Sequence, residues 1–436
     1  MRASIPRTQI SYGWFVLAAG FFVLFISMGA RNGLGVFIIP MSDEFGWSRG
    51  TISLALAVGW IANAVTQPLI GRIYDRYGAR KVISTALLIV GSMAVLLSWT
   101  NSLWFMVLVY GLIMSVAAGG ASLVTVHAVL AKWFYRRRGI ALSISTAGAS
   151  AGALVLTPFT AYLILLAGWR MTWGVLGMMV LLLGVPVALL LIRDDPRDVG
   201  ETPDGDTTEP DSRKTTAHAS HPHGPLEVEN WRESFRSAPI WQLSGAYFVC
   251  GMTTAIISFH YIPFAIDRGF SLSTAALAFG LMSGLNVVGV LGVGVLSDKF
   301  ERRYLLGAVY GVRGLAYAML ILAPGALGLW GFAVIAGLSW IASAPMTSSL
   351  TADIYGIKAL GTLGGITNFA HQMGGALSIV MGGVLYDMFG AYDVPFAIAG
   401  SLLTAASIAA FSVGEKRYSA RYQSRPTGAA VAATGD

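Results

Sequence analysis

The chain of 436 residues is 55% hydrophobic and only 12% charged, against about 25% charged in ordinary soluble domains. Such a sequence could fold in water only with large exposed apolar patches, which excludes a soluble globule and favours a membrane protein. The single cysteine, Cys250, excludes a disulfide or a two-cysteine metal site within one chain.

Twelve stretches carry few or no charges and approach the length of about 20 residues that a helix needs to cross a bilayer. In chain order they are 13–40, 51–71, 82–99, 103–130, 139–165, 170–192, 238–265, 271–297, 304–323, 329–351, 359–385 and 394–414. We therefore expect an all-α membrane protein with twelve transmembrane helices. Its predicted parts are a six-helix bundle at 1–192, a cytoplasmic linker at 193–237, a second six-helix bundle at 238–415 and a cytoplasmic tail at 416–436.

Basic residues gather in alternate loops. The loops at 72–81, 132–138 and 299–303 hold four, four and three Arg or Lys residues, whereas the loops between them hold only Arg49, Arg170 and Arg268. Because basic residues near helix ends resist translocation, we expect these loops and both termini on the cytoplasmic side of a bacterial-type inner (plasma) membrane. The net charge of +7 then reflects topology and does not indicate a nucleic-acid partner.

The two halves of the chain repeat at one offset. Residues 71–81 read GRIYDRYGARK and residues 294–303 read GVLSDKFERR, and their aspartates, Asp75 and Asp298, are separated by close to half the chain. Residues 147–154 match residues 370–377 at four positions with the same offset. The sequence therefore predicts a duplicated, pseudo-symmetric membrane bundle, and transporters of this kind place the substrate site at the interface between repeats.

No motif for the use of ATP is present in the sequence. A phosphate-binding loop needs a Gly-Lys pair, and none of the six lysines follows a glycine. We expect a protein that is not an enzyme and has neither cofactor nor metal, so that any transport runs on gradients.

The first basic loop carries a family signature. Its residues Gly71, Asp75, Arg76, Gly78, Arg80 and Lys81 match the loop between the second and third helices of the major facilitator superfamily, and Gly294, Asp298 and Arg303 form a degraded second copy. The chain resembles that superfamily over about 10–415 apart from the linker. More narrowly, GVFIIP (35–40), FGWSR (45–49), WFYRRRGIAL (133–142) and the small residues at 148–152 resemble the bacterial monocarboxylate-porter branch.

The resemblance implies two bundles that rock around a central cavity lined by the first, fourth, seventh and tenth helices. It also implies that Asp75 caps a neighbouring helix, pairs with an arginine and gates the cytoplasmic side. The alternative is that the loop charges only set topology. One position departs from the porters: Val290 stands where they carry a substrate-binding Arg, although the Asn one turn earlier is present as Asn286.

Ionisable and polar side chains inside predicted spans are the candidates for substrate contact, because they are costly in a membrane. Arg31, with Asn32 beside it, lies about 26 Å along the first helix from Trp14 and is suited to binding a carboxylate with two hydrogen bonds. The alternative is that Arg31 reaches the outer surface or pairs with Asp43 or Glu44.

The second half offers His260 with Tyr261 in the seventh helix, and His371 with Gln372 in the eleventh. A histidine can bind an anion when protonated and can transfer protons near neutral pH, although a buried histidine can equally be a neutral packing residue. Arg313, in the ninth helix, is expected to satisfy backbone carbonyls or to pair with a neighbouring helix.

The acidic residues bear on the charge of the substrate. No carboxylate lies between Asp75 and Asp194, and those of the second half fall near helix ends. Carriers of organic cations and proton-coupled sugar carriers generally need a mid-membrane carboxylate, so the remaining Arg and His residues favour an anion. We predict a monomeric secondary transporter of small organic anions, foremost monocarboxylates, that works in the lipid bilayer by proton symport or exchange. Efflux of lipophilic compounds is the alternative, and a non-transporting sensor is a more remote one.

Overall fold

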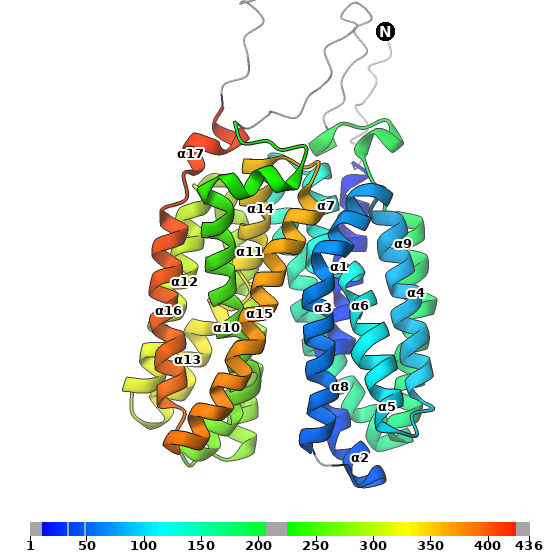
Figure 1. Ribbon diagram of the computed structural model, residues 1–436, viewed down its shortest axis with the longest axis vertical. Helices are drawn as coiled ribbons and strands as arrows, with labels where there is room; N and C mark the ends of the chain where they lie inside the picture. Colours follow the sequence, from blue (N-terminus) through cyan, green and yellow to red (C-terminus); the bar gives the residue numbers. More distant parts are fainter. Residues whose placement is uncertain (1–10, 33–34, 48, 206–224, 424–436) are drawn as a thin grey trace, which may run out of the picture.

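The computed structural model describes residues 11–32, 35–47, 49–205 and 225–423, which form helices joined by short loops (Figure 1). The first half holds α1 (Gly13–Asn32), α2 (Gly35–Phe45), α3 (Arg49–Tyr77), α4 (Ala79–Leu97), α5 (Leu103–Met106), α6 (Ser115–Ala118), α7 (Leu123–Trp133), α8 (Arg138–Met179) and α9 (Val185–Leu191). The second half holds α10 (Ala238–Asp267), α11 (Leu272–Lys299), α12 (Arg302–Leu322), α13 (Gly325–Ser339), α14 (Ser343–Tyr355), α15 (Leu360–Phe389), α16 (Asp393–Phe411) and α17 (Glu415–Tyr418).

Each predicted span has a helical counterpart, and the all-α prediction is confirmed. In the described part of the chain, nine helical segments are long and apolar enough to cross a membrane, and the remaining predicted spans correspond to α1, α3 and α15. The fifth and sixth spans share α8 and separate at Gly168, whose φ of 78° interrupts the helix. The fourth and tenth spans are each built from more than one helix: α5 to α7, and α13 with α14.

The outer surface of the bundle is apolar. Long hydrophobic side chains point away from the protein, among them Leu165, Trp104 and Leu322, which are 87%, 80% and 80% exposed. A continuous apolar surface of this kind is unfavourable in water but matches the hydrocarbon core of a bilayer. The exposed faces of the helices therefore agree with insertion in a membrane.

The helices gather into two bundles, α1 to α9 and α10 to α16, each with its own apolar core (Figure 1). The bundles meet along two seams: α3 packs on α15, and α8 packs on α11. The loops at 72–81, 132–138 and 299–303 lie at the upper end of Figure 1, which we call the basic end. Toward the opposite end, α3 and α15 diverge in this view.

Candidate functional site

The carboxylate of Asp75, near the end of α3, caps the first turn of α15 in the opposite bundle. It accepts hydrogen bonds from the backbone N–H groups of Gly361 (2.9 Å) and Thr362 (2.8 Å) and from the Thr362 hydroxyl (2.6 Å). A carboxylate at a helix N-terminus pairs N–H groups that have no partner within the helix and interacts favourably with the helix dipole. The implied helix cap is present, but no arginine pairs with Asp75 among the residues that the structure describes.

Asp298, near the end of α11, repeats this arrangement at the second seam. Its carboxylate accepts hydrogen bonds from the backbone N–H groups of Gly139 (2.8 Å) and Ile140 (3.1 Å) in the first turn of α8. Each bundle therefore supplies one aspartate that caps a helix of the other bundle. Both contacts join the two bundles at the basic end.

The signature glycines permit the close approach of helices at the two seams. A Cβ atom on Gly71 would lie 2.2 Å from the carbonyl oxygen of Gly361 in α15. A Cβ atom on Gly294 would lie 2.4 Å from the Cβ atom of Ser143 in α8. Small residues at such crossings let backbones pack directly against each other in a membrane protein.

A buried ion cluster lies beside the second seam. Asp353, at the end of α14, pairs with Arg138 at the start of α8 and with Arg302 at the start of α12, and all three side chains are at most 3% exposed. The pair with Arg138 joins the two bundles. Breaking a buried ion pair leaves an uncompensated charge, so this contact resists separation of the bundles as long as water does not reach it. Sequence reasoning placed Asp353 only among the acids near helix ends and missed this cluster.

The other predicted gating residues contact their own bundle. Gly78 has a φ of 84° and makes the turn between α3 and α4. The backbone N–H of Arg80 donates to the carboxylate of Asp194 (2.8 Å) in the same bundle. Arg303 contacts acids of its own bundle, and Arg76 is exposed at the end of α3. A gating role for these four residues stays a prediction.

Uncharged hydrogen bonds also join the bundles at greater depth than the ion cluster. They include those of His127 Nδ1 with Ser348 Oγ (2.8 Å), Asn286 Nδ2 with Ser150 Oγ (2.8 Å) and Gln372 Nε2 with Asn63 Oδ1 (3.2 Å). The sequence predicts Asn286 and Gln372 as substrate ligands, but in this structure they are only 1% and 8% exposed. Their side-chain amides are engaged across the seams.

His371 lies on the packed side of α15. The exposed residues of this helix recur every three or four positions and share one face: Phe369, Met373, Leu377, Val380 and Val384. His371 is two positions from Met373, or about 160° around the helix from that face. It is half-buried, with its ring centroid 4.5 Å from that of Tyr247 and its Nε2 3.5 Å from Thr254 Oγ1. Its Nδ1 has no hydrogen-bond partner in the described chain.

Arg313 is buried near His371, and Cys250 neighbours both side chains. Its guanidinium donates to the carbonyls of Ser339 and Trp340 between α13 and α14, which confirms the predicted role in satisfying backbone carbonyls. It also lies 3.3 Å from the sulfur of Cys250, which in turn neighbours the His371 ring. Within the described chain no carboxylate pairs with Arg313, whose hydrogen-bond partners are two backbone carbonyls, the Thr253 hydroxyl and the sulfur of Cys250.

The remaining substrate candidates lie apart from these groups. Tyr261 is fully buried in the core of the second bundle, where its hydroxyl donates to the carbonyl of Leu329 (2.9 Å). His260 contacts the backbone carbonyl of Ile379 at 3.1 Å. Arg31 and Asn32 belong to the last turn of α1, and their side chains lie outside what the structure describes.

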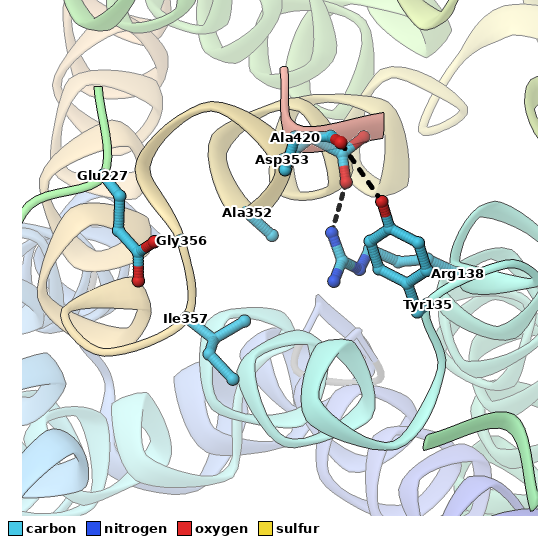
Figure 2. Close-up of a pocket in the computed structure, with 8 residues that line it drawn as sticks. All are labelled: Tyr135, Arg138, Glu227, Ala352, Asp353, Gly356, Ile357 and Ala420. Carbon is cyan, nitrogen blue, oxygen red and sulfur yellow. Dashed lines mark hydrogen bonds and ion pairs between the residues drawn. The ribbon is translucent and has the colours of Figure 1, made fainter. Parts of the chain in front are cut away.

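A small pocket at the basic end lies beside the ion cluster, between the linker and the C-terminal segment (Figure 2). The hydroxyl of Tyr135, from the loop before α8, donates to the carbonyl of Ala420 (3.3 Å), and Glu227 of the linker lines the other side. Arg421 donates to backbone carbonyls at the end of α11, including that of Asp298. The C-terminal segment is therefore docked on the second signature loop and touches both bundles.

Residues 20–379 match the family model of the Major Facilitator Superfamily, and the chain belongs to this family of membrane transporters. The predictions of a twelve-helix transporter fold and of a protein that is not an enzyme are thereby confirmed.

Relatives of the chain are similar over most of their length. The Uncharacterized MFS-type transporter YcxA of Bacillus subtilis is 29% identical, covering 88% of this chain and 91% of the relative. The Probable sulfoacetate transporter SauU of Cupriavidus necator is 27% identical, covering 93% and 95%. The human Monocarboxylate transporter 11 is 27% identical, covering 91% and 82%.

Solved structures of the fucose:proton symporter FucP of E. coli share the fold. One superposes with a TM-score of 0.67 at 17% identity, covering 92% of this chain and 98% of FucP. FucP in the outward conformation gives a TM-score of 0.66 at 16% identity, covering 90% and 97%.

Proposed function

We propose that the chain is a secondary transporter of small organic anions, foremost monocarboxylates, that works by alternating access with proton symport or exchange. Residues 1–192 and 238–415 are its two moving bundles, 193–237 the linker and 416–436 the tail. The protein acts as a monomer in the plasma membrane. Its basic end and both termini face the cytoplasm, because basic loops resist translocation.

The closed basic end supports an outward-facing state in this orientation. The two aspartate caps and the Arg138–Asp353 pair join the bundles near that end. The uncharged hydrogen bonds of His127, Asn286 and Gln372 join the bundles further toward the middle of the membrane. A substrate would therefore enter from the opposite side, and release into the cytoplasm requires these contacts to separate.

The main observation in favour of an anionic substrate is that Arg313 has no carboxylate partner in the described chain. A guanidinium enclosed in protein interacts strongly with other charges because the surroundings are poorly polarisable. Since no carboxylate pairs with Arg313 in the described chain, we infer that it leaves the interior of the second bundle positive. His371 and Arg313 both neighbour Cys250, and the buried Nδ1 of His371 has no hydrogen-bond partner in the described chain. An anion is favoured there, and a cation is disfavoured.

The names of two relatives indicate the same chemistry. Sulfoacetate and monocarboxylates are small organic anions with a carboxylate group, and these are the compounds named for SauU and Monocarboxylate transporter 11. We propose that His371 and Arg31 contact the carboxylate of the substrate in this chain. Arg31 supplies the direct two-pronged contact that Val290 cannot provide.

Binding to the purified protein tests the proposal. Thermal stabilisation or calorimetry is measured with a monocarboxylate, with sulfoacetate, with the uncharged amide of the monocarboxylate and with a lipophilic cation. We expect stabilisation by the anions only, weakened in Arg31→Ala and His371→Ala. Equal stabilisation by the amide or by the lipophilic cation would contradict an anion site and favour efflux of lipophilic compounds.

A further inference from the structure

Two buried asparagines occupy the same position in the two halves of the chain. Asn63 in α3 and Asn286 in α11 are separated in sequence by the same offset that relates Asp75 to Asp298. Each asparagine is 1% exposed. A primary amide enclosed in a bilayer must find hydrogen-bond partners, because an unpaired polar group is costly there.

Asn63 joins three elements from two bundles. Its Nδ2 donates to the backbone carbonyl of Ser115 (2.7 Å), at the start of α6 in the irregular fourth span. Its Oδ1 accepts from Gln67 Nε2 (3.2 Å) in α3 and from Gln372 Nε2 (3.2 Å) in α15 of the other bundle. The backbone carbonyl can only accept, which fixes the orientation of the amide.

Asn286 joins the equivalent three elements. Its Oδ1 accepts from the backbone N–H of Ile341 (2.9 Å), in the break between α13 and α14 of the tenth span. Its Nδ2 donates to Ser150 Oγ (2.8 Å) in α8 of the other bundle. Each asparagine therefore ties the interrupted span of its own bundle to a helix of the opposite bundle.

The two asparagines lie near the middle of the membrane. α3 continues from Asn63 to its end at Tyr77, and α11 continues from Asn286 to its end at Lys299. At about 1.5 Å per residue, the asparagines lie about 21 Å and about 20 Å from the ends of their helices at the basic end. The aspartate caps and the ion cluster lie nearer the basic end, so these amide bonds are deeper.

When the basic end opens, each asparagine keeps its contact within its own bundle and loses its contact with the other bundle. Asn63–Ser115 and Asn286–Ile341 lie within one bundle and persist when the bundles move as units. Asn63–Gln372 and Asn286–Ser150 cross a seam and must break. Both kinds involve only uncharged groups, so the crossing bonds can break and re-form without moving a charge through the membrane.

We propose that Asn63 and Asn286 are a pseudo-symmetric pair of gating residues. They close the passage between the middle of the membrane and the basic end, and loss of their crossing bonds opens it. The inference rests on the alternating-access part of the proposed function and does not depend on the charge of the substrate.

Variants of the partner residues isolate the crossing bonds. Ser150→Ala removes the crossing bond of Asn286 and leaves its bond to Ile341, and Gln372→Met removes the crossing bond of Asn63 and leaves its bond to Ser115. Ser145→Ala is the matched control, because this buried serine of α8 donates to Leu142 within its own helix. Replacing small polar side chains by apolar ones of similar or smaller size keeps the helices intact.

The measurement is the distance between spin labels on the two bundles at the basic end. Lys81 at the start of α4 and Lys299 at the end of α11 are exposed and carry the labels after substitution by Cys, with the buried Cys250 replaced by Ser. Double electron–electron resonance in the absence of substrate gives the populations of closed and open forms. Because no substrate is added, the result is independent of whether the anion assignment succeeds.

We expect Ser150→Ala and Gln372→Met each to raise the open-to-closed ratio about fivefold, the effect of one uncharged hydrogen bond. The double variant should show the product of the two effects, and Ser145→Ala should match the parent protein. Distance distributions for both variants that equal those of Ser145→Ala would overturn the gating role. A shift in only one of them would overturn the paired arrangement. For a variant of low yield, maleimide labelling in membranes of a single cysteine at Thr351 gives the same comparison, because this residue is 1% exposed between the bundles in the closed form and becomes accessible on opening.

Discussion

Replacing Asp75 by asparagine is expected to weaken closure of the basic end. The Asp75 carboxylate accepts three hydrogen bonds from the first turn of α15 across the seam. Hydrogen bonds to a charged group contribute about 1.5–3 kcal/mol, against about 0.5–1.5 kcal/mol between uncharged groups. Asparagine keeps one acceptor oxygen, and loss of a helix cap costs about 0.5–2 kcal/mol. We therefore expect about 2 kcal/mol in favour of the open form, or about thirtyfold in the open-to-closed ratio.

The assay combines uptake into proteoliposomes with the spin-label distance across the basic end. Asp75→Asn should shift the distance distribution toward the open form and slow transport, while the yield of folded protein stays at the parent level. Arg137→Gln is the control, because this residue of another basic loop is exposed and lies outside the signature. If Asp75→Asn and Arg137→Gln gave the same rate and the same distances, the signature loop would serve topology only, and the gating argument would fail.

Three further variants test neighbouring steps of the account. Gly71→Ala places a Cβ atom 2.2 Å from the carbonyl oxygen of Gly361, so it should hold the basic end open and stop transport. Gly383→Ala is the control and should have no such effect, because no atom lies within 4 Å of the added Cβ. Arg31→Ala should weaken anion binding, measured by calorimetry, by about 2–5 kcal/mol. Arg31→Lys should be intermediate, because lysine keeps the charge but cannot form the two parallel hydrogen bonds of a guanidinium. Full affinity in Arg31→Ala would remove this residue from the site. If His371 relays protons, His371→Ala should lose uptake driven by an acid-outside gradient and keep exchange; equal loss of both would indicate binding or folding instead.

The repeat and the apolar spans were enough to predict the architecture. Two long charge-poor stretches on either side of Gly168 predicted two spans, and the glycine supplies the positive φ that separates them. The matched aspartates at one offset predicted equivalent loops, and both cap a helix of the opposite bundle. These features depend on local composition and on chain symmetry, which a single sequence displays directly.

The direction of each polar side chain could not be predicted in the same way. Asn286 and Gln372 fall in membrane spans like substrate ligands, yet both turn to the seams, and Tyr261 turns to the core of its bundle. Rotation of a helix about its axis is set by packing against several neighbours at once. One signal was available and was missed: Asn63 matches Asn286 at the repeat offset.

The most direct test of the central claim is uptake of labelled compounds into proteoliposomes of the purified protein, with and without a pH gradient. The panel holds monocarboxylates, sulfoacetate, their uncharged analogues and a lipophilic dye. The account predicts saturable uptake of at least one small carboxylate or sulfonate, accelerated by an acid exterior or by internal substrate. Movement of the dye and the uncharged analogues, with no uptake of any anion, would contradict it.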